Sequence, residues 1–408
     1  MATNPIAPGC PVHAERDDRK SAGLAEKKFK PFRNSRVSRS FAFSRDILRS
    51  PAMKQAGGGS DGVVIDNPDH VTFFFLDGDV HRRRRAAVAS YFAPKAIVTR
   101  YQPIMRQTMD MLVGGLRSAG TARLDDMSFE MASNVTMAIV GLTEQKDNVA
   151  LGRRIKKILD MSTIWDRGPV GKLFHETLFG WVHKAIITWH TMRLYEVAIK
   201  PAVEARRKEP RDDVVSYMVQ QGYSKPNMII ECLTYASAGV TTTRELMGMV
   251  AWHFFDNPDL RDTFLAAGEE EQIAIIEEIL RLDPVSGFLY RRPVEDVAAT
   301  AGGPIAEGEL MAVSIRDSNL DEATVGACPF QIDPGRAKRQ KVVGAFMSFG
   351  DGPHRCPGSQ VALHETRIFI DRLFRVPGLR LVSGPTMNWN AANQGYELRD
   401  MVIACEPG

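Results

Sequence analysis

A short stretch near the C-terminal end, residues 349–358 with the sequence FGDGPHRCPG, constrains the fold of this chain most. It sets one cysteine, Cys356, in a loop rich in glycine and proline, and apolar residues at helical spacing follow it. Pro357 suits the first position of a helix, because its missing N–H costs nothing there. We therefore expect Cys356 at a helix N-terminus, where unpaired backbone N–H groups stabilise a thiolate.

A lone cysteine on such a loop has three interpretations. It can be a buried structural residue, since free cysteine is among the most buried residue types. It can be a catalytic nucleophile. It can also be the axial ligand of a haem iron, to which a thiolate gives electron density that favours O–O cleavage. Glycines in the loop suit the third interpretation, because they let the backbone pass close to a flat, bulky group.

The pattern F-G-x-G-x-H-x-C-x-G in this stretch closely resembles the haem-binding loop of bacterial cytochromes P450. The resemblance implies haem b (iron protoporphyrin IX) as the cofactor and Cys356 as the ligand of its iron. It also implies that Phe349 and Gly358 bind the haem, and that His354 contacts a haem propionate.

The composition fits an enzyme of this kind. The chain has 408 residues, 44% of them hydrophobic and 25% charged, which is ordinary for a globular protein with an ample core. A net charge of +3 gives no sign of nucleic-acid binding. The five cysteines are scattered and form no Cys-x-x-Cys pair, so we predict neither a zinc site nor a disulfide framework. A reducing cytoplasm is the expected compartment.

Residues 1–30 are polar and charged, and they lack the apolar run of a signal peptide or a membrane anchor. We expect a flexible tail here, including Cys10 and His13, followed by one domain over residues 31–408. A regulatory haem or metal contact is the other interpretation of Cys10 and His13. Microsomal members of the family carry an anchor, so the resemblance implies a soluble, bacterial-type protein.

The basic run HRRRR at residues 81–85 is usually a solvated face or a patch for a polyanion. His81 and Arg85 are four residues apart, so they share one helix face and suit two carboxylates held close together. The run resembles the His-x-x-x-Arg of the P450 C helix, which assigns His81 and Arg85 to the haem propionates. We expect the arginines between them at the surface, some of them facing an acidic electron donor.

Residues 227–255 form the longest stretch with a helical pattern. Its centre, Gly239 followed by Thr241, Thr242 and Thr243, is a poor helix former, so some other property must compensate. Small residues let a flat cofactor and O2 approach, and threonine hydroxyls can bond the carbonyl four residues earlier. The alternative is a small-residue site where another helix packs.

This centre resembles the oxygen-binding groove of the P450 I helix, Ala/Gly-Gly-x-Asp/Glu-Thr-Thr/Ser. Ala238, Gly239, Thr242 and Thr243 match, and the resemblance implies that Thr242 hydrogen-bonds the bound oxygen. Thr241 stands where the family has an acid on its proton route. Two replacements remain open. Glu245 can pass protons through water, or Thr241, Thr242 and ordered water suffice.

Glu278-x-x-Arg281 alone is a common surface pair. In this order it resembles the K-helix pair of the family, which buries its charges against a later arginine, and Arg336 is the candidate. We interpret this trio as structural support for the cysteine loop. In the following strand the resemblance places Arg291 on a propionate, with Arg292 as the competing choice.

Two apolar segments are interpreted from the same resemblance. Residues 71–76 are a buried strand or core segment that borders the substrate pocket. The segment 165–189 is dense in large side chains, among them Trp165, Phe174, Trp181 and Trp189. It corresponds to the lid over the substrate, which we therefore expect to be apolar and bulky.

The resemblance covers nearly the whole chain after residue 30. It implies a mostly α fold with small β-sheets, the triangular prism of cytochromes P450. The implied activity is a haem-thiolate monooxygenase that inserts one atom of O2 into a small hydrophobic substrate, in a monomer without a membrane anchor. Electrons must come from a separate protein, since no flavin- or iron–sulfur-binding region is found. A ferredoxin with its reductase is expected, docking on Lys338, Arg339, Lys341 and Arg355.

Two alternatives stay open at this point. The missing acid at Thr241 fits peroxide-driven catalysis, or an oxidative coupling without oxygen insertion. A haem-thiolate sensor or carrier that performs no turnover belongs to a different class, and the Gly239/Thr242 groove argues against it.

Overall fold

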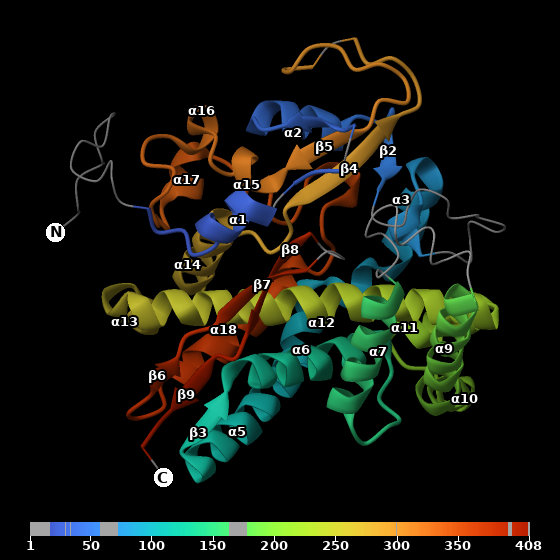
Figure 1. Cartoon of the computed structure of the whole chain (residues 1–408). Helices are drawn as coiled ribbons and strands as arrows, with labels where there is room; N and C mark the ends of the chain where they lie inside the picture. The colour runs from blue at the N-terminus through green and yellow to red at the C-terminus, as the bar shows by residue number, and fades with distance from the viewer. Residues whose placement is uncertain are drawn as a thin grey trace. The chain divides into compact units, whose positions relative to one another are not determined.

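The structure is a computed structural model, and it describes residues 17–28, 30–32, 34–57, 72–162, 178–298, 300–390 and 394–406. The chain divides into two compact units, each described separately below. The chain passes between them within two long helices, α12 (Lys225–Asp256) and α18 (Ser359–Phe374). Most described residues are helical and the sheets are small, so the predicted mostly α fold is confirmed (Figure 1).

The first unit comprises Met1–Val63, Gly248–Ser359 and Gly384–Arg399. Its four-stranded sheet has the order β1-β5-β4-β2, in which β1 and β5 are parallel and the other pairs antiparallel. Helix α2 and strand β5 share one buried apolar cluster that includes Ile47 and Val313. The elements of this unit are α1 (Ala22–Lys28), β1 (Arg36–Ser38), α2 (Phe41–Arg49), β2 (Met53–Ala56), α13 (Pro258–Ala266), α14 (Glu269–Leu282), β4 (Phe288–Pro293), β5 (Met311–Ser314), α15 (Ile315–Ser318), α16 (Glu322–Val325), α17 (Arg336–Gln340), η7 (Gly352–His354), β7 (Thr386–Asn390) and β8 (Gly395–Arg399).

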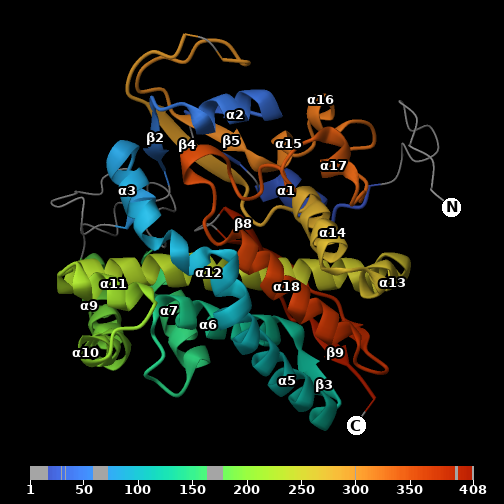
Figure 2. The same ribbon diagram turned by 180° about the vertical axis from the view of Figure 1, so that it is seen from behind.

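The second unit comprises Val64–Met247, Gln360–Ser383 and Asp400–Gly408. Helices α5 and α6 pack together through fully buried methionines such as Met105 and Met131. The antiparallel sheet β3-β9-β6 lies at one end of α5, and both views show β3 beside that helix (Figures 1 and 2). The elements of this unit are η2 (Phe73–Phe75), α3 (Gly78–Val88), η3 (Ala89–Phe92), α4 (Pro94–Ala96), η4 (Ile97–Tyr101), α5 (Gln102–Ala119), β3 (Thr121–Arg123), α6 (Leu124–Val140), α7 (Asn148–Ser162), α9 (Leu178–Leu194), η6 (Tyr195–Ile199), α10 (Lys200–Lys208), α11 (Val214–Gln220), β6 (Arg380–Ser383) and β9 (Val402–Ala404).

Several predicted elements are confirmed and two are corrected. The long helix over 227–255 is α12, and the strand expected after Asp283-Pro284 is β4. The strand interpretation of residues 71–76 is wrong, because Phe73–Phe75 form a single 3-10 turn, although Phe73 is buried. The predicted start of the last long helix at Pro357 is also wrong, because α18 begins at Ser359.

The N-terminal part departs from the expected flexible tail over residues 1–30. Helix α1 forms within it, and the Ser21 side chain is buried. Buried Asp283 accepts hydrogen bonds from the Ser21 N–H and hydroxyl, at 2.8 and 2.5 Å, and contacts His253 Nε2 at 2.9 Å. Burial opposes ionisation of Asp283, but these hydrogen bonds lower its pKa overall. The chain is therefore anchored from Ser21 on, while Cys10 and His13 lie outside the described residues.

Three further expectations concern organisation. One domain over residues 31–408 stays a prediction. The scattered cysteines gave no sign of a disulfide framework, and Cys328 is nevertheless disulfide-bonded. Within the described ranges, no helix combines the length and the apolar character that crossing a membrane requires.

Candidate functional site

The cysteine loop of the first unit is a tightly bonded turn. The Cys356 N–H donates to the Phe349 carbonyl at 2.8 Å, and the Gly350 N–H donates to the Met347 carbonyl at 2.8 Å. Gly352 has a φ of 65°, and a Cβ there would lie 2.4 Å from the Leu48 carbonyl oxygen, so this position requires glycine. The Cys356 side chain remains partly exposed on this turn.

A carboxylate fastens the loop to α2. Asp351 accepts from the Gly352 N–H at 2.7 Å and pairs with Arg49 at 2.9 Å and Arg45 at 3.6 Å. Its side chain therefore connects the loop backbone to two basic residues on one helix. This arrangement presents Cys356 on a fixed segment.

The predicted charge trio is confirmed as a buried cluster. Glu278 pairs with Arg281 at 2.7 Å and with Arg336 at 2.9 Å, and all three side chains are almost fully buried. The remaining guanidinium hydrogens donate to backbone carbonyls, including those of Asn319 and Val325. Every charge is thus paired and hydrogen-bonded, as burial requires.

This cluster reaches the chain just before the cysteine loop. The Asn319 amide donates to the Arg281 carbonyl at 3.1 Å and to the Ser348 hydroxyl at 2.8 Å. Its oxygen accepts from the Met347 N–H at 2.8 Å. Ser348 in turn donates to the Leu280 carbonyl at 2.9 Å. The charge trio therefore supports the segment that leads into Phe349.

The two arginines competing for a propionate role differ in burial. Arg291 on β4 is buried and donates to the Tyr290 carbonyl at 2.7 Å, while Arg292 reaches the Gly308 carbonyl at 2.6 Å near the surface. His354 lies in the short helix η7, partly buried. A buried cation suits a desolvated anionic group better than an exposed one. Burial therefore favours Arg291 over Arg292.

The centre of α12 in the second unit shows the predicted backbone contacts. The Thr241 hydroxyl donates to the Ser237 carbonyl and the Thr242 hydroxyl donates to the Ala238 carbonyl, each at 2.7 Å. Gly239 packs against α6 so closely that a Cβ would lie 2.4 Å from Thr136 Oγ1. The glycine therefore serves the helix-packing role considered for it, at least in part, while Ala238 is exposed.

Glu245 lies one turn further along α12 and is buried. Its neighbour Arg244 pairs with buried Asp125 of α6 at 3.3 Å. This ion pair joins α12 to α6. The role of Glu245 in proton supply stays a prediction.

Helix α3 places His81 and Arg85 on one face, as their spacing predicted. His81 is buried and Arg85 is partly buried. The expectation of surface positions holds for Arg82 and Arg83 but is wrong for Arg84, which is buried. Arg84 lies three residues from His81, and the spacing of His81, Arg84 and Val88 marks the buried face of this helix.

Arg84 belongs to a buried polar cluster that the sequence analysis missed. Its guanidinium donates to the Tyr217 hydroxyl and lies 5.2 and 5.0 Å from the ring centroids of Tyr217 and Tyr223. Glu231 on α12 lies near this charge, buried, and the same helix carries Tyr235 one turn later. Neither carboxylate oxygen of Glu231 accepts a hydrogen bond of good geometry from the described chain.

Burial governs the protonation of Glu231. It raises the pKa of this carboxyl to about 7, against the opposing effects of the Arg84 charge and the Thr72 hydroxyl. The same buried surroundings raise the pKa of Tyr235 well above its usual value. Nothing in the composition of residues 227–255 marks Glu231, because its partner comes from a distant helix.

The basic residues expected to receive an electron donor are on the first unit. Lys338, Arg339 and Lys341 are exposed, and Arg355 is partly buried. Arg339 pairs with Asp333. Lys338 and Lys341 leave positive charge at the surface on and directly after α17.

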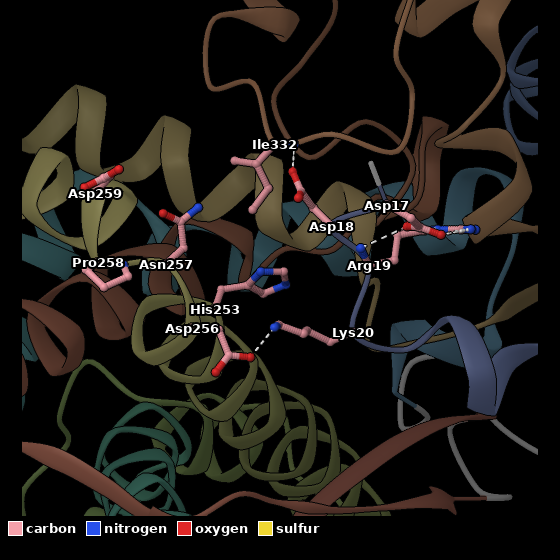
Figure 3. A pocket seen from close by; sticks show the side chains of 10 residues that line it. All are labelled: Asp17, Asp18, Arg19, Lys20, His253, Asp256, Asn257, Pro258, Asp259 and Ile332. Atoms are coloured by element: carbon pink, nitrogen blue, oxygen red, sulfur yellow. Dashed lines mark hydrogen bonds and ion pairs between the residues drawn. The ribbon is translucent and has the colours of Figure 1, made fainter. Parts of the chain in front are cut away.

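A separate polar pocket borders the N-terminal segment of the first unit (Figure 3). Within it Lys20 pairs with Asp256, and the Asp18 carboxylate accepts from the Ile332 N–H at 2.9 Å. None of the predicted site residues lines it. We interpret this pocket as part of the anchor of the N-terminal segment.

The donor set fits a haem better than a bare metal ion. In the part of the chain that the structure describes, no three His, Cys, Asp or Glu side chains gather to hold a metal. A metal bound at Cys356 must therefore bring its other ligands with it, as a porphyrin does. Buried His81 and Arg291 are cationic or neutral donors of the kind that bind propionates.

Comparison with known sequences agrees with these features. The sequence model of the family described as Cytochrome P450 matches residues 273–376, which hold the charge trio and the cysteine loop. The chain is 25% identical over 360 residues to a Steroid C26-monooxygenase of Mycolicibacterium smegmatis, covering 85% of this chain and 82% of that protein. It is 25% identical over 348 residues to the Biotin biosynthesis cytochrome P450 of Bacillus subtilis, covering 83% and 80%.

Solved structures share the fold. CalO2 has a TM-score of 0.75 at 22% identity, over 95% of both chains. P450BioI, solved in complex with an acyl carrier protein bearing hexadec-9Z-enoic acid, has a TM-score of 0.72 at 21% identity, over 91% of this chain and 92% of that one.

Proposed function

The chain belongs to the cytochrome P450 family and is a monooxygenase, and from that premise we propose that it inserts one atom of O2 into a small hydrophobic substrate. The observation that carries the proposal is the cysteine loop. Its backbone is locked by the bond from Cys356 to Phe349 and supported by the buried trio around Glu278. A partly exposed thiol on so fixed a turn suits an axial ligand.

Cys356 would hold the iron of haem b, with Phe349 and Gly358 beside it in the loop. His81 and Arg85 of α3, together with Arg291 and His354, would bind the propionates. When bound, a thiolate-ligated haem supplies activation of O2. The protein residues fix its position and neutralise its charge, because cationic donors form the stronger hydrogen bonds to carboxylates.

The threonines of α12 would handle water and protons. Thr241 and Thr242 donate their hydroxyl hydrogens to backbone carbonyls, so their oxygen lone pairs remain able to accept hydrogen bonds from water. Small, exposed Ala238 leaves room beside them, whereas Gly239 is taken up by the packing against α6. Glu245 is our candidate for the acid that Thr241 lacks. Electrons would come from a separate donor, such as a ferredoxin with its reductase.

An absorbance titration of the ferric haem protein tests this function. Steroids, fatty acids and aromatic compounds are added in turn, with Cys356→Ser as the control for thiolate ligation. We expect a low-spin to high-spin shift with one chemical class in the native protein. A haem spectrum that Cys356→Ser leaves unchanged contradicts the assignment of the ligand.

Product formed per NAD(P)H consumed tests the α12 residues. Thr242→Ala is expected to divert oxygen to peroxide while substrate binding persists. Glu245→Gln is expected to lower the coupling as well if this acid feeds protons. Unchanged coupling in Glu245→Gln would leave Thr241, Thr242 and water as the route.

A second form of this function has an acyl group on a carrier protein as its substrate. One relative is named for biotin biosynthesis, and one structural neighbour was solved with an acyl carrier protein. In this chain the feature that favours it is the exposed face of α9, which carries two tryptophans and basic residues but no acid.

A further inference from the structure

Helix α9 is apolar on its outer face as well as its inner one. Leu194 is fully buried on the inner face, whereas Trp181 is 76% exposed and Trp189 is 55% exposed. Single exposed apolar residues are common, but a contiguous set on one helix marks an interaction site. The exposed set is Trp181, Val182, Ile186, Trp189 and Met192.

Positive charge surrounds this apolar face. The sequence of α9 contains no aspartate or glutamate. Loss of hydration, followed by the charges of Lys157 and Arg154 on α7 and of Arg193 on α9, lowers the pKa of His190. These three cations therefore lie near His190, the residue that follows Trp189. A partner that covers the face must supply negative charge as well as apolar surface.

The position of Arg193 indicates what kind of partner fits. Val182, Ile186, Trp189 and Arg193 follow one another at spacings of three and four residues, so they form one stripe. A helix that lies in a membrane interface carries its basic residues on the face opposite the apolar one, whereas Arg193 lies within the apolar stripe itself. Against a protein the same guanidinium can pair with a carboxylate. The stripe therefore favours a protein partner over a lipid surface.

Trp189 is also held in place before any partner arrives. Its ring lies edge-on to the His190 ring with centroids 4.8 Å apart, and the Arg193 guanidinium lies 5.4 Å from its centroid. Tryptophan and arginine are the residue types that most often dominate protein interfaces. A pre-positioned aromatic side chain loses little freedom on binding. His183 Nε2 contacts the Met161 carbonyl at 2.9 Å, which ties α9 to α7 beneath this face.

We propose that the surface formed by the outer face of α9 with Arg154 and Lys157 of α7 is the docking site for a small acidic carrier protein. The partner would place carboxylates against Arg193, Arg154 and Lys157, and apolar side chains against Trp181 and Trp189. Delivery of a bound acyl substrate by this partner rests on the proposed monooxygenase function, but the docking itself does not.

Direct binding measurements with the haem-loaded full chain test the site. The probe is an acyl carrier protein, unloaded and loaded with a long-chain acyl group, at low and at high salt. We expect binding that weakens with salt, because the charge pairs are near the surface. Trp189→Ala should weaken it at least about tenfold, as expected for a central aromatic residue. Arg193→Glu should weaken it and reduce its salt dependence.

Matched controls come from α5 in the same unit. Met111 and Arg117 are exposed there, so Met111→Ala and Arg117→Glu change the same residue types away from the site. Both should bind the carrier like the native chain. The ferric haem titration with free hydrophobic compounds should be the same for all four variants. Loss of carrier binding with that titration intact supports the docking site.

Three results would overturn the proposal. The carrier protein shows no binding in either loading state, or Trp189→Ala and Arg193→Glu bind it as well as the native chain does. Alternatively, vesicles of anionic phospholipid bind and the carrier does not, and Trp189→Ala abolishes that binding, which would assign the face to a membrane. Binding of the loaded carrier without any haem spectral shift would contradict delivery of the acyl group as a substrate and leave the docking site standing.

Discussion

Glu278 and Glu231 are both buried glutamates beside arginine, yet their surroundings differ. Glu278 is bonded to Arg281 and Arg336, and its oxygen also accepts from the Asp333 N–H at 3.1 Å. Glu231 lies near Arg84 with neither oxygen hydrogen-bonded within the described residues, and burial raises its pKa to about 7. The comparison teaches that proximity of an arginine does not by itself offset the burial of an acid. Direct hydrogen bonds to a carboxylate favour its charged form.

The largest loss of stability is expected when Glu278, whose carboxylate is bonded to both arginines, is replaced. Glu278→Gln leaves Arg281 and Arg336 buried beside a neutral amide, and we expect a loss of about 3–5 kcal/mol in the free energy of unfolding. Denaturant unfolding of the haem-loaded protein at neutral pH measures it. Glu271→Gln, on the exposed face of the same helix, is the control and should change stability by less than about 0.5 kcal/mol. Equal effects of the two substitutions would show that the trio is dispensable.

Sequence reasoning reached the Glu278 cluster but not the Glu231 cluster, and the reason is physical. Glu278 and Arg281 share one helix turn, and their spacing together with a later arginine is a pattern that a single sequence displays. Arg84 sits in a run of four arginines whose composition is uniform. Only the period His81, Arg84, Val88 distinguishes the inward position. Glu231 has no local signal, because burial by a distant element decides its state.

In the cysteine loop, too, the sequence predicted some features and not others. Its sequence predicted Cys356 on a tight, glycine-dependent turn, and Gly352 has the positive φ that such a turn needs. The start of α18 at Ser359, two residues beyond Pro357, was not predictable, because a sequence pattern fixes the end of a helix only to within one or two residues. The segment 165–189 was assigned to the lid from the resemblance, and its composition indicated only that the lid is apolar and bulky. Neither observation says which side of a helix faces water.

Glu365 on α18 is a third buried glutamate, and burial is the one effect on its pKa, which it raises to about 8. The acid is neutral in the folded protein and ionises in the unfolded chain, so its contribution to stability is complete below pH about 4.5 and is lost as pH rises through about 8. Glu365→Gln removes this loss of stability at high pH, because glutamine does not ionise. We expect the variant to be more stable than the native protein by a few kcal/mol at pH about 8.5, and equal to it at pH about 4.5.

Thermal unfolding at both pH values checks this expectation. A variant that is less stable than the native protein at the higher pH would show that Glu365 is ionised and hydrogen-bonded in the folded protein.

Glu231→Gln should also stabilise the protein at high pH, but by less than Glu365→Gln does. The pKa of Glu231 is about 7, so the native protein loses its contribution between pH about 4.5 and 7. We expect a gain of about 2–3 kcal/mol for the variant at pH about 8, and none at pH about 4.5. The same unfolding series measures it, with Glu278→Gln as the counterpart of opposite sign. A loss of stability at pH 8 would mean that Arg84 needs the ionised carboxylate.

The smallest effect is expected for Arg339→Ala, which removes an ion pair that is exposed and not buried. Arg339 lies three residues after Arg336 and pairs with Asp333, but the Arg339 side chain is exposed. An exposed pair gains little, because water screens the charges and both side chains lose freedom, so Arg339→Ala should cost less than about 1 kcal/mol. Arg336→Ala, which removes a cation bonded to Glu278 at 2.9 Å, should cost several times more. Denaturant unfolding of the two variants side by side measures the ratio. Equal losses would mean that the number of ion pairs around Asp333 and Glu278 matters for stability, and that their burial does not.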